Sequence, residues 1–173
     1  MDQSSLHSSL IAERDRVLAA FDALVVDGRA TTVDVTEPGG WTAQDVLAHL
    51  LHMVGQLALA AGRLTGDVPE GPPATPPGYL EGVTERLTAE QWNERAIAWW
   101  RARPIEELRA DFVRNASLLV DRVGRMTDAD LARTDVVPWQ GAGRPFWHFL
   151  GYDTCLHEWP AHAAQLEAAA QSA

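Results

Sequence analysis

The sequence contains no lysine: all 14 of its basic residues are arginine, against 24 aspartates and glutamates. Codon usage in a GC-rich genome is the simplest explanation, but the absence still excludes any mechanism that needs a Schiff-base lysine. The formal net charge of −10 argues against a nucleic-acid partner, because binding DNA relies on basic side chains that neutralise phosphates. Acids dominate, so we expect no nucleic-acid partner.

Cysteine and long apolar runs are also scarce. The single cysteine, Cys155, excludes an internal disulfide and is typical of a reducing compartment. No apolar run approaches the roughly 20 residues needed to span a bilayer, and the first residues show no basic region followed by an apolar core. We therefore expect a cytoplasmic protein with no membrane partner. Its 173 residues, 46% hydrophobic, predict a single domain over residues 1–173 with a sizeable core.

Apolar residues recur three or four positions apart in four long stretches, the pattern of amphipathic helices. A shorter helix is expected at 88–100 and a helical turn at 127–133, while proline- and glycine-rich stretches at 66–78 and 134–144 predict loops. No strand pair is evident, so the fold class is all-α, most simply a four-helix bundle. The four long helices are predicted over residues 5–26, 42–64, 104–123 (with Pro104 at the first helical position) and 145–170.

The best-defined helix start is at Thr42. Thr42 is a good N-cap, and Asp45 three residues later completes a capping box. Trp41 and Val46 are placed to form a hydrophobic staple around this start. The helix carries His49 two turns into a largely apolar segment, so the function depends on what His49 meets there.

The last helix holds two pairs of polar residues that differ in their angular separation. At about 100° per residue, Glu158 and His162 lie roughly 40° apart, whereas His157 and His162 lie roughly 140° apart. One metal ion can therefore be bound by the first pair and hardly by the second. With His49 from a facing helix, the set becomes two imidazoles and a carboxylate, which binds zinc with an open fourth position or iron as a facial triad. The alternative is a set of hydrogen-bonded histidines, since roughly one such Glu/Asp–His pair is expected by chance at this composition.

Other residues near these positions have simpler expected roles. We expect Trp139 and Trp159 to contact a substrate, and Cys155 to pack in the apolar core. His52 lies one turn from His49, where it either supports that residue or faces solvent. Pro160 lacks an amide proton and lies between Glu158 and His162, so we predict one long helix kinked where its ring meets the Leu156 carbonyl.

Four short motifs together resemble the DinB/YfiT-like superfamily, and the resemblance covers nearly the whole chain. Members of that superfamily are four-helix bundles. They commonly hold a divalent metal with a histidine on the second helix and two residues one turn apart on the last helix. The motifs are Gly40–Leu50, Trp92-Asn93-Glu94-Arg95, Arg103-Pro104-Ile105-Glu106-Glu107-Leu108 and His162-x-x-Gln165-Leu166.

Two branches of the superfamily are similar to different parts of the chain. The middle, from Trp92 to Leu131, resembles the ClbS/DfsB family, which is associated with self-resistance to DNA-alkylating natural products. The site residues resemble mycothiol-dependent maleylpyruvate isomerase, whose ligands are His, Glu and His, the last two as Glu-x-x-x-His. By that resemblance the ligands here are His49, Glu158 and His162.

The resemblance implies three hypotheses for function. The first is an enzyme with a divalent metal, zinc before nickel or iron, and with mycothiol or another low-molecular-weight thiol as cosubstrate. It would catalyse thiol S-transfer to a small electrophile, or a thiol-dependent isomerisation. The second is a ClbS-like hydrolase or sequestering protein that needs no metal, and the third is a non-catalytic binding bundle. In each case the partner is a small molecule, and a homodimer is left open.

Overall fold

A computed structural model describes residues 2–36, 40–67, 87–136 and 143–172 of the chain. Within these ranges the protein is built from helices, with no strand and a lone β-bridge between Asp34 and Thr42. The all-α prediction is confirmed. The helices are α1 (Gln3–Val26), α2 (Ala43–Thr65), α3 (Ala89–Arg101), α4 (Ile105–Arg125), α5 (Asp128–Leu131), the π-helix η2 (His148–Glu158) and α6 (Trp159–Gln171), which continues from η2.

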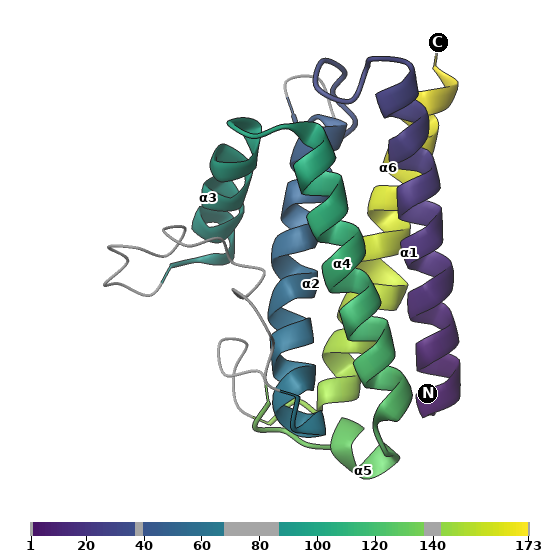
Figure 1. The fold of residues 1–173 in the computed structure, drawn as a ribbon, viewed down its shortest axis with the longest axis vertical. Coiled ribbons are helices and arrows are strands. Elements are labelled where there is room, and N and C mark those ends of the chain that lie inside the picture. Colours follow the sequence, from purple (N-terminus) through teal and green to yellow (C-terminus); the bar gives the residue numbers. More distant parts are fainter. Residues whose placement is uncertain (1, 37–39, 68–86, 137–142, 173) are drawn as a thin grey trace.

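Four long helical segments form the bundle (Figure 1). Helix α2 packs along α4, and α1 packs along both α4 and the last segment, η2 with α6. Helices α2 and α4 run in the same direction, opposite to α1 and α6, so the connection from α2 must return along the bundle before α4 begins. That connection carries α3, which lies outside the bundle against α2.

The predicted helix starts agree closely with the structure. Capping boxes are present at Thr42 with Asp45, at Thr88 with Gln91, and at Thr127 with Asp130. The start of α4 differs from the prediction by one residue. Pro104 has an extended backbone (ψ 138°) and lies before the first helical residue rather than at it. Its carbonyl accepts from the Glu107 amide at 3.1 Å and from the Leu108 amide at 3.3 Å, which are the first main-chain hydrogen bonds of the helix.

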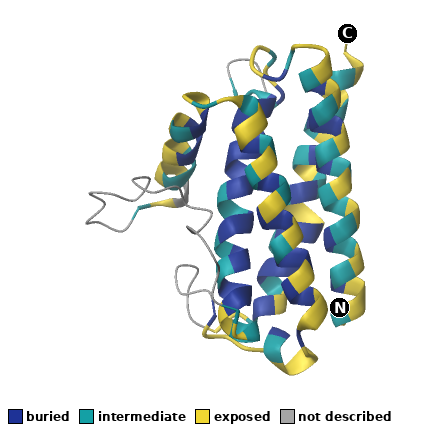
Figure 2. Cartoon of the chain, viewed as in Figure 1, coloured by how far each residue is buried: buried dark blue, intermediate teal, exposed yellow. Residues whose placement is uncertain are grey.

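Helix α2 forms the centre of the core. By length and composition alone it would pass as a membrane span, but 78% of its most apolar window is buried within the protein. Figure 2 shows α2 buried along most of its length. The cause is its position, since α4 packs on one of its sides and α3 on another. Within α2, Arg63 alone is exposed.

The last segment differs from the prediction in its winding. The segment is continuous, as predicted, but its first 11 residues wind as a π-helix rather than an α-helix. Its five-residue spacing is visible where Trp159 N–H donates to the Thr154 carbonyl and Thr154 Oγ1 donates to the Phe149 carbonyl at 2.8 Å. Pro160 has no amide proton to continue this pattern. The wide turns end at Glu158, and α-helix follows from Trp159 with Pro160 in its first turn.

Candidate metal centre

His49 is held in place by its neighbours on α2 and α3. The side chain of Asp45, one turn earlier, is fully buried and accepts two hydrogen bonds of 2.7 Å from Arg101 of α3. Gln44 Nε2 also donates to the Trp100 carbonyl at 2.9 Å. These contacts fasten α3 across the start of α2. As a result, His49 is only 6% exposed and faces both α3 and the last helix.

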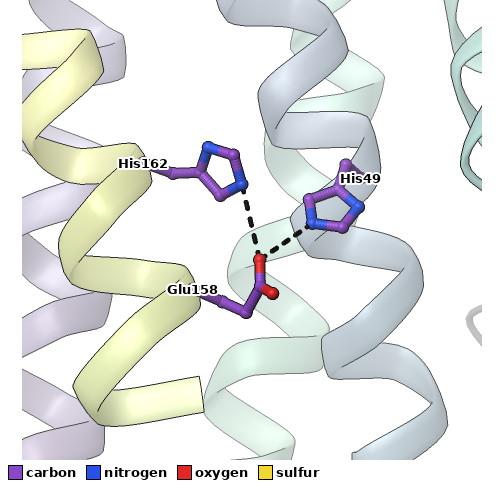
Figure 3. A group of neighbouring side chains, drawn as sticks. All are labelled: His49, Glu158 and His162. Carbon is purple, nitrogen blue, oxygen red and sulfur yellow. Dashed lines mark hydrogen bonds and ion pairs between the residues drawn. The ribbon is translucent and has the colours of Figure 1, made fainter. Parts of the chain in front are cut away.

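Glu158 and His162 reach His49 from the last helix. Glu158 Oε2 lies 3.2 Å from His49 Nε2 and 3.5 Å from His162 Nε2, so one carboxylate oxygen faces both imidazoles (Figure 3). The three candidate donor atoms all lie within 4.8 Å of one another. The predicted convergence of these side chains is confirmed. Glu158 is the last residue of η2 and His162 lies in α6, so the four-residue spacing spans the return to α-helix.

The outward nitrogen of each imidazole is bound to an amide oxygen. His49 Nδ1 lies 2.9 Å from Asn93 Oδ1, and His162 Nδ1 lies 2.7 Å from Gln165 Oε1. An amide oxygen only accepts, so each Nδ1 carries the proton and each Nε2 lone pair points toward Glu158. Partners of this kind set the tautomer and the ring orientation of metal-binding histidines.

This donor set fits a divalent cation. Two lone pairs and a carboxylate facing one another repel unless a cation or extra protons lie between them. The hydrogen bond with His162, and next that with His49, holds the pKa of the Glu158 carboxyl well below its usual range. Two imidazole nitrogens and a carboxylate oxygen are ligands that zinc, iron and nickel accept. His49, Glu158 and His162 are therefore arranged as a possible site for a divalent metal.

Trp41 forms a wall of this site, which the sequence did not indicate. Its indole ring is tilted at 45° to His49, with centroids 5.2 Å apart, and is near-parallel to His162 at 6.2 Å. The side chains of His49 and His162 are 8% and 12% exposed, whereas that of Glu158 is 37% exposed. The site is thus closed around the imidazoles and open to solvent beside the carboxylate.

The structure describes one of the two tryptophans that were expected to contact a substrate. Trp159 is 1% exposed and packs against Phe112 with ring centroids 6.1 Å apart, which is a core position and corrects the expectation of a pocket wall. Trp139 lies outside the described residues. His157 lies outside the site, as predicted. Its ring centroid is 4.3 Å from that of Tyr152, and both residues are exposed.

His52, beside His49, and Cys155, in the core, are both electrically neutral near pH 7. His52 is half-buried and stacks on Trp92 with centroids 5.4 Å apart; burial, and next the nearby His49, lower its pKa to about 4. Cys155 is 3% exposed in the core, as predicted, and burial raises the pKa of its thiol to about 12. Cys155 is therefore a thiol rather than a thiolate, and does not act as a nucleophile.

Sequence reasoning missed two supporting residues, Asn93 and Gln165. Gln165 follows His162 by three residues on the same helix, so helical spacing was a usable signal. Asn93 is 44 residues from His49 along the chain and meets it only because α3 folds back on α2. Both residues stand in motifs noted above, but neither motif alone assigns a hydrogen bond.

Comparison with known proteins gives one match. Residues 35–167 match the family described as mycothiol maleylpyruvate isomerase N-terminal domain. Neither a curated protein nor a solved structure matches the chain. The matched region contains all three candidate ligands together with Trp41, Asn93 and Gln165.

Proposed function

The chain belongs to the mycothiol maleylpyruvate isomerase N-terminal domain family, and from that premise we propose that it is a divalent-metal enzyme that uses a thiol. His49, Glu158 and His162 hold the ion, zinc before nickel or iron. Mycothiol or another low-molecular-weight thiol is the cosubstrate, and the reaction is S-transfer to a small electrophile or a thiol-dependent isomerisation. The observation that carries the proposal is the convergence of three donors, of which the two imidazoles already have their outward nitrogens hydrogen-bonded.

When bound, such an ion keeps a position open to a ligand and lowers the pKa of a thiol there, so that a thiolate is present at neutral pH. The chain's own residues prepare that position. The buried imidazoles keep water from one side, and the half-exposed Glu158 leaves the other side accessible to small molecules. Substrates therefore approach beside the carboxylate.

The chain supplies neither a thiolate nor a lysine for covalent catalysis. Its one thiol, Cys155, is buried with a raised pKa, and the sequence contains no lysine. A thiol from outside is consistent with these absences and with the description of the family. We further propose that the protein acts in the cytoplasm, where such thiols stay reduced, on a small molecule and without nucleic acid or membrane as partner.

Metal analysis of the purified, untagged protein tests the proposal. We expect close to one divalent ion per chain, and conjugation or isomerisation of an electrophile that needs both the metal and added thiol. A protein that binds no divalent ion after reconstitution would contradict the proposal. Turnover without thiol or metal would favour a ClbS-like hydrolase instead, and binding without turnover would favour a non-catalytic bundle.

A further inference from the structure

The main chain of Trp41 is anchored on both sides. Its N–H donates to Thr36 Oγ1 at 2.9 Å, and its carbonyl accepts from the Val35 amide at 2.8 Å. The next residue, Thr42, is the N-cap of α2. The indole therefore projects from a fixed point at the start of α2, and it packs against the core while remaining partly exposed.

From that point the indole reaches histidines of two different helices. It contacts the ring of His49 on α2 and the ring of His162 on α6, which are themselves 5.2 Å apart and nearly perpendicular, at 69°. Helices α2 and α6 contact each other much less than either contacts its main partner in the bundle. Direct helix packing thus does little to set the distance between the two imidazoles.

Glu158 contacts both imidazoles at their Nε2 atoms, but the hydrogen bonds at their outward Nδ1 atoms do not connect the two rings. Asn93 holds His49 from α3, and Gln165 holds His162 from its own helix, so neither bond links the two ligands to each other. The indole does link them, because its flat face limits the tilt of both rings at once. An aromatic wall of this kind favours ring contacts that a flexible apolar side chain cannot reproduce.

We infer that Trp41 is a positioning residue that holds His49 and His162 at their metal-binding separation. It donates no ligand itself. This role rests on the proposed function, because it presupposes that the three donors bind an ion. A preset separation lowers the cost of ordering the two side chains when the ion binds, so loss of the indole weakens metal binding without removing a ligand.

The test compares Trp41→Phe and Trp41→Met with the wild-type full chain, after removal of resident metal by dialysis against a chelator. The probe is Co²⁺, whose visible absorption reports the number and geometry of its ligands. Methionine fills the apolar volume without a flat ring. We expect Trp41→Met to bind Co²⁺ about 10–100-fold more weakly, as for other residues that support metal ligands. Trp41→Phe should fall between Trp41→Met and wild type.

Trp147→Leu is the matched control, since Trp147 also contacts a histidine, His148, that lies outside the three donors. The Trp147→Leu variant should bind Co²⁺ like the wild type. Melting temperatures show whether each variant is folded at the temperature of the binding assay. Equal Co²⁺ affinity and spectra in wild type, Trp41→Phe and Trp41→Met would overturn the role of Trp41 while leaving the metal site intact. A wild type that binds no Co²⁺ would overturn both. If Trp41→Met does not fold, the Trp41→Phe variant decides, and wild-type affinity in that variant overturns the inference.

Discussion

The two helices that build the site differ in how their shapes are determined. Helix α2 begins with a capping box and ends at Gly66 in the left-handed region (φ 75°), and its His49 sits in regular α-helix. The last segment has a π-helix of 11 residues, a proline, and a ligand at the point where the winding changes. No side chain caps the start of α6. Thus the α-helix that carries His49 follows from local signals, whereas the change of winding at Glu158 depends on how the last segment packs.

The largest expected effect comes from removing a ligand from either helix. His49→Ala and His162→Ala should each reduce bound metal to background, because two remaining donors hold an ion poorly. Both variants should stay folded, since the apolar core contributes more to stability than two polar ligands do. Metal analysis with circular dichroism measures both. His157→Ala, in the last segment but outside the donor set, is the control and should keep its metal; near-stoichiometric metal in the ligand variants would refute this assignment.

The second comparison concerns the amide partners of the two imidazoles. Asn93→Ala and Gln165→Ala should each weaken metal binding about 10–100-fold, because each leaves an Nδ1–H without its acceptor. Asn93→Asp and Gln165→Glu keep an acceptor and should restore part of the affinity. Competition with a chromophoric chelator measures the change. Affinities that do not move in the alanine variants would mean that these bonds do not orient the ligands.

The third prediction tests the fastening of α3 to α2 through the Asp45–Arg101 pair. Arg101→Ala should lower the free energy of unfolding by about 2 kcal/mol, because it leaves the buried Asp45 carboxylate unpaired. We expect less than for a fully buried pair, since Arg101 is 57% exposed and water screens it. Urea unfolding at pH 7 measures the loss, and Arg95→Ala, on the exposed face of α3, is the control.

The pH dependence of the same pair has a definite sign. Burial raises the pKa of Asp45, but the hydrogen bonds from Arg101 and Thr42 together outweigh it, so the net pKa is lowered. The stability from this pair is therefore present above the ordinary aspartate pKa of about 3.9 and is lost as the pH falls through the lower folded value. Wild type and Arg101→Ala should converge in stability as the pH falls below about 4. A difference that persists unchanged at pH 3 would contradict the assignment to Asp45.

The smallest effect is expected from Pro160→Ala. The alanine restores an amide proton, so the winding beside Glu158 can change, and its carboxylate should move relative to the two histidines. Thermal stability should rise or stay unchanged, while metal affinity falls a few-fold. Pro104→Ala, at the start of α4, is the control for a proline outside the site. A clearly destabilised Pro160→Ala with wild-type metal affinity would show that the proline serves the fold rather than the site.

The helices, and the contacts of the site that lie within one helix, could be predicted from the order of the residues. Capping at Thr42 depends on Asp45 three residues away, and the pairing of Glu158 with His162 depends on one helical turn. Interactions of this range need only the local backbone geometry. The same reasoning overlooked the π-helix, because it searched for apolar residues three or four positions apart. The buried residues of this segment instead recur five positions apart, at Phe149, Thr154 and Trp159 and at Leu150 and Cys155.

Only the tertiary structure decided which residues support the ligands. Asn93 meets His49 because the connection between α2 and α4 brings α3 back along α2. Trp41 reaches His162 because the last segment lies beside the start of α2. Trp159, expected to contact a substrate, instead lies in the core, since one residue of helix turns its side chain by about 100° from that of Glu158. A sequence carries the spacing within each helix, but the distances between helices come from how their side chains pack.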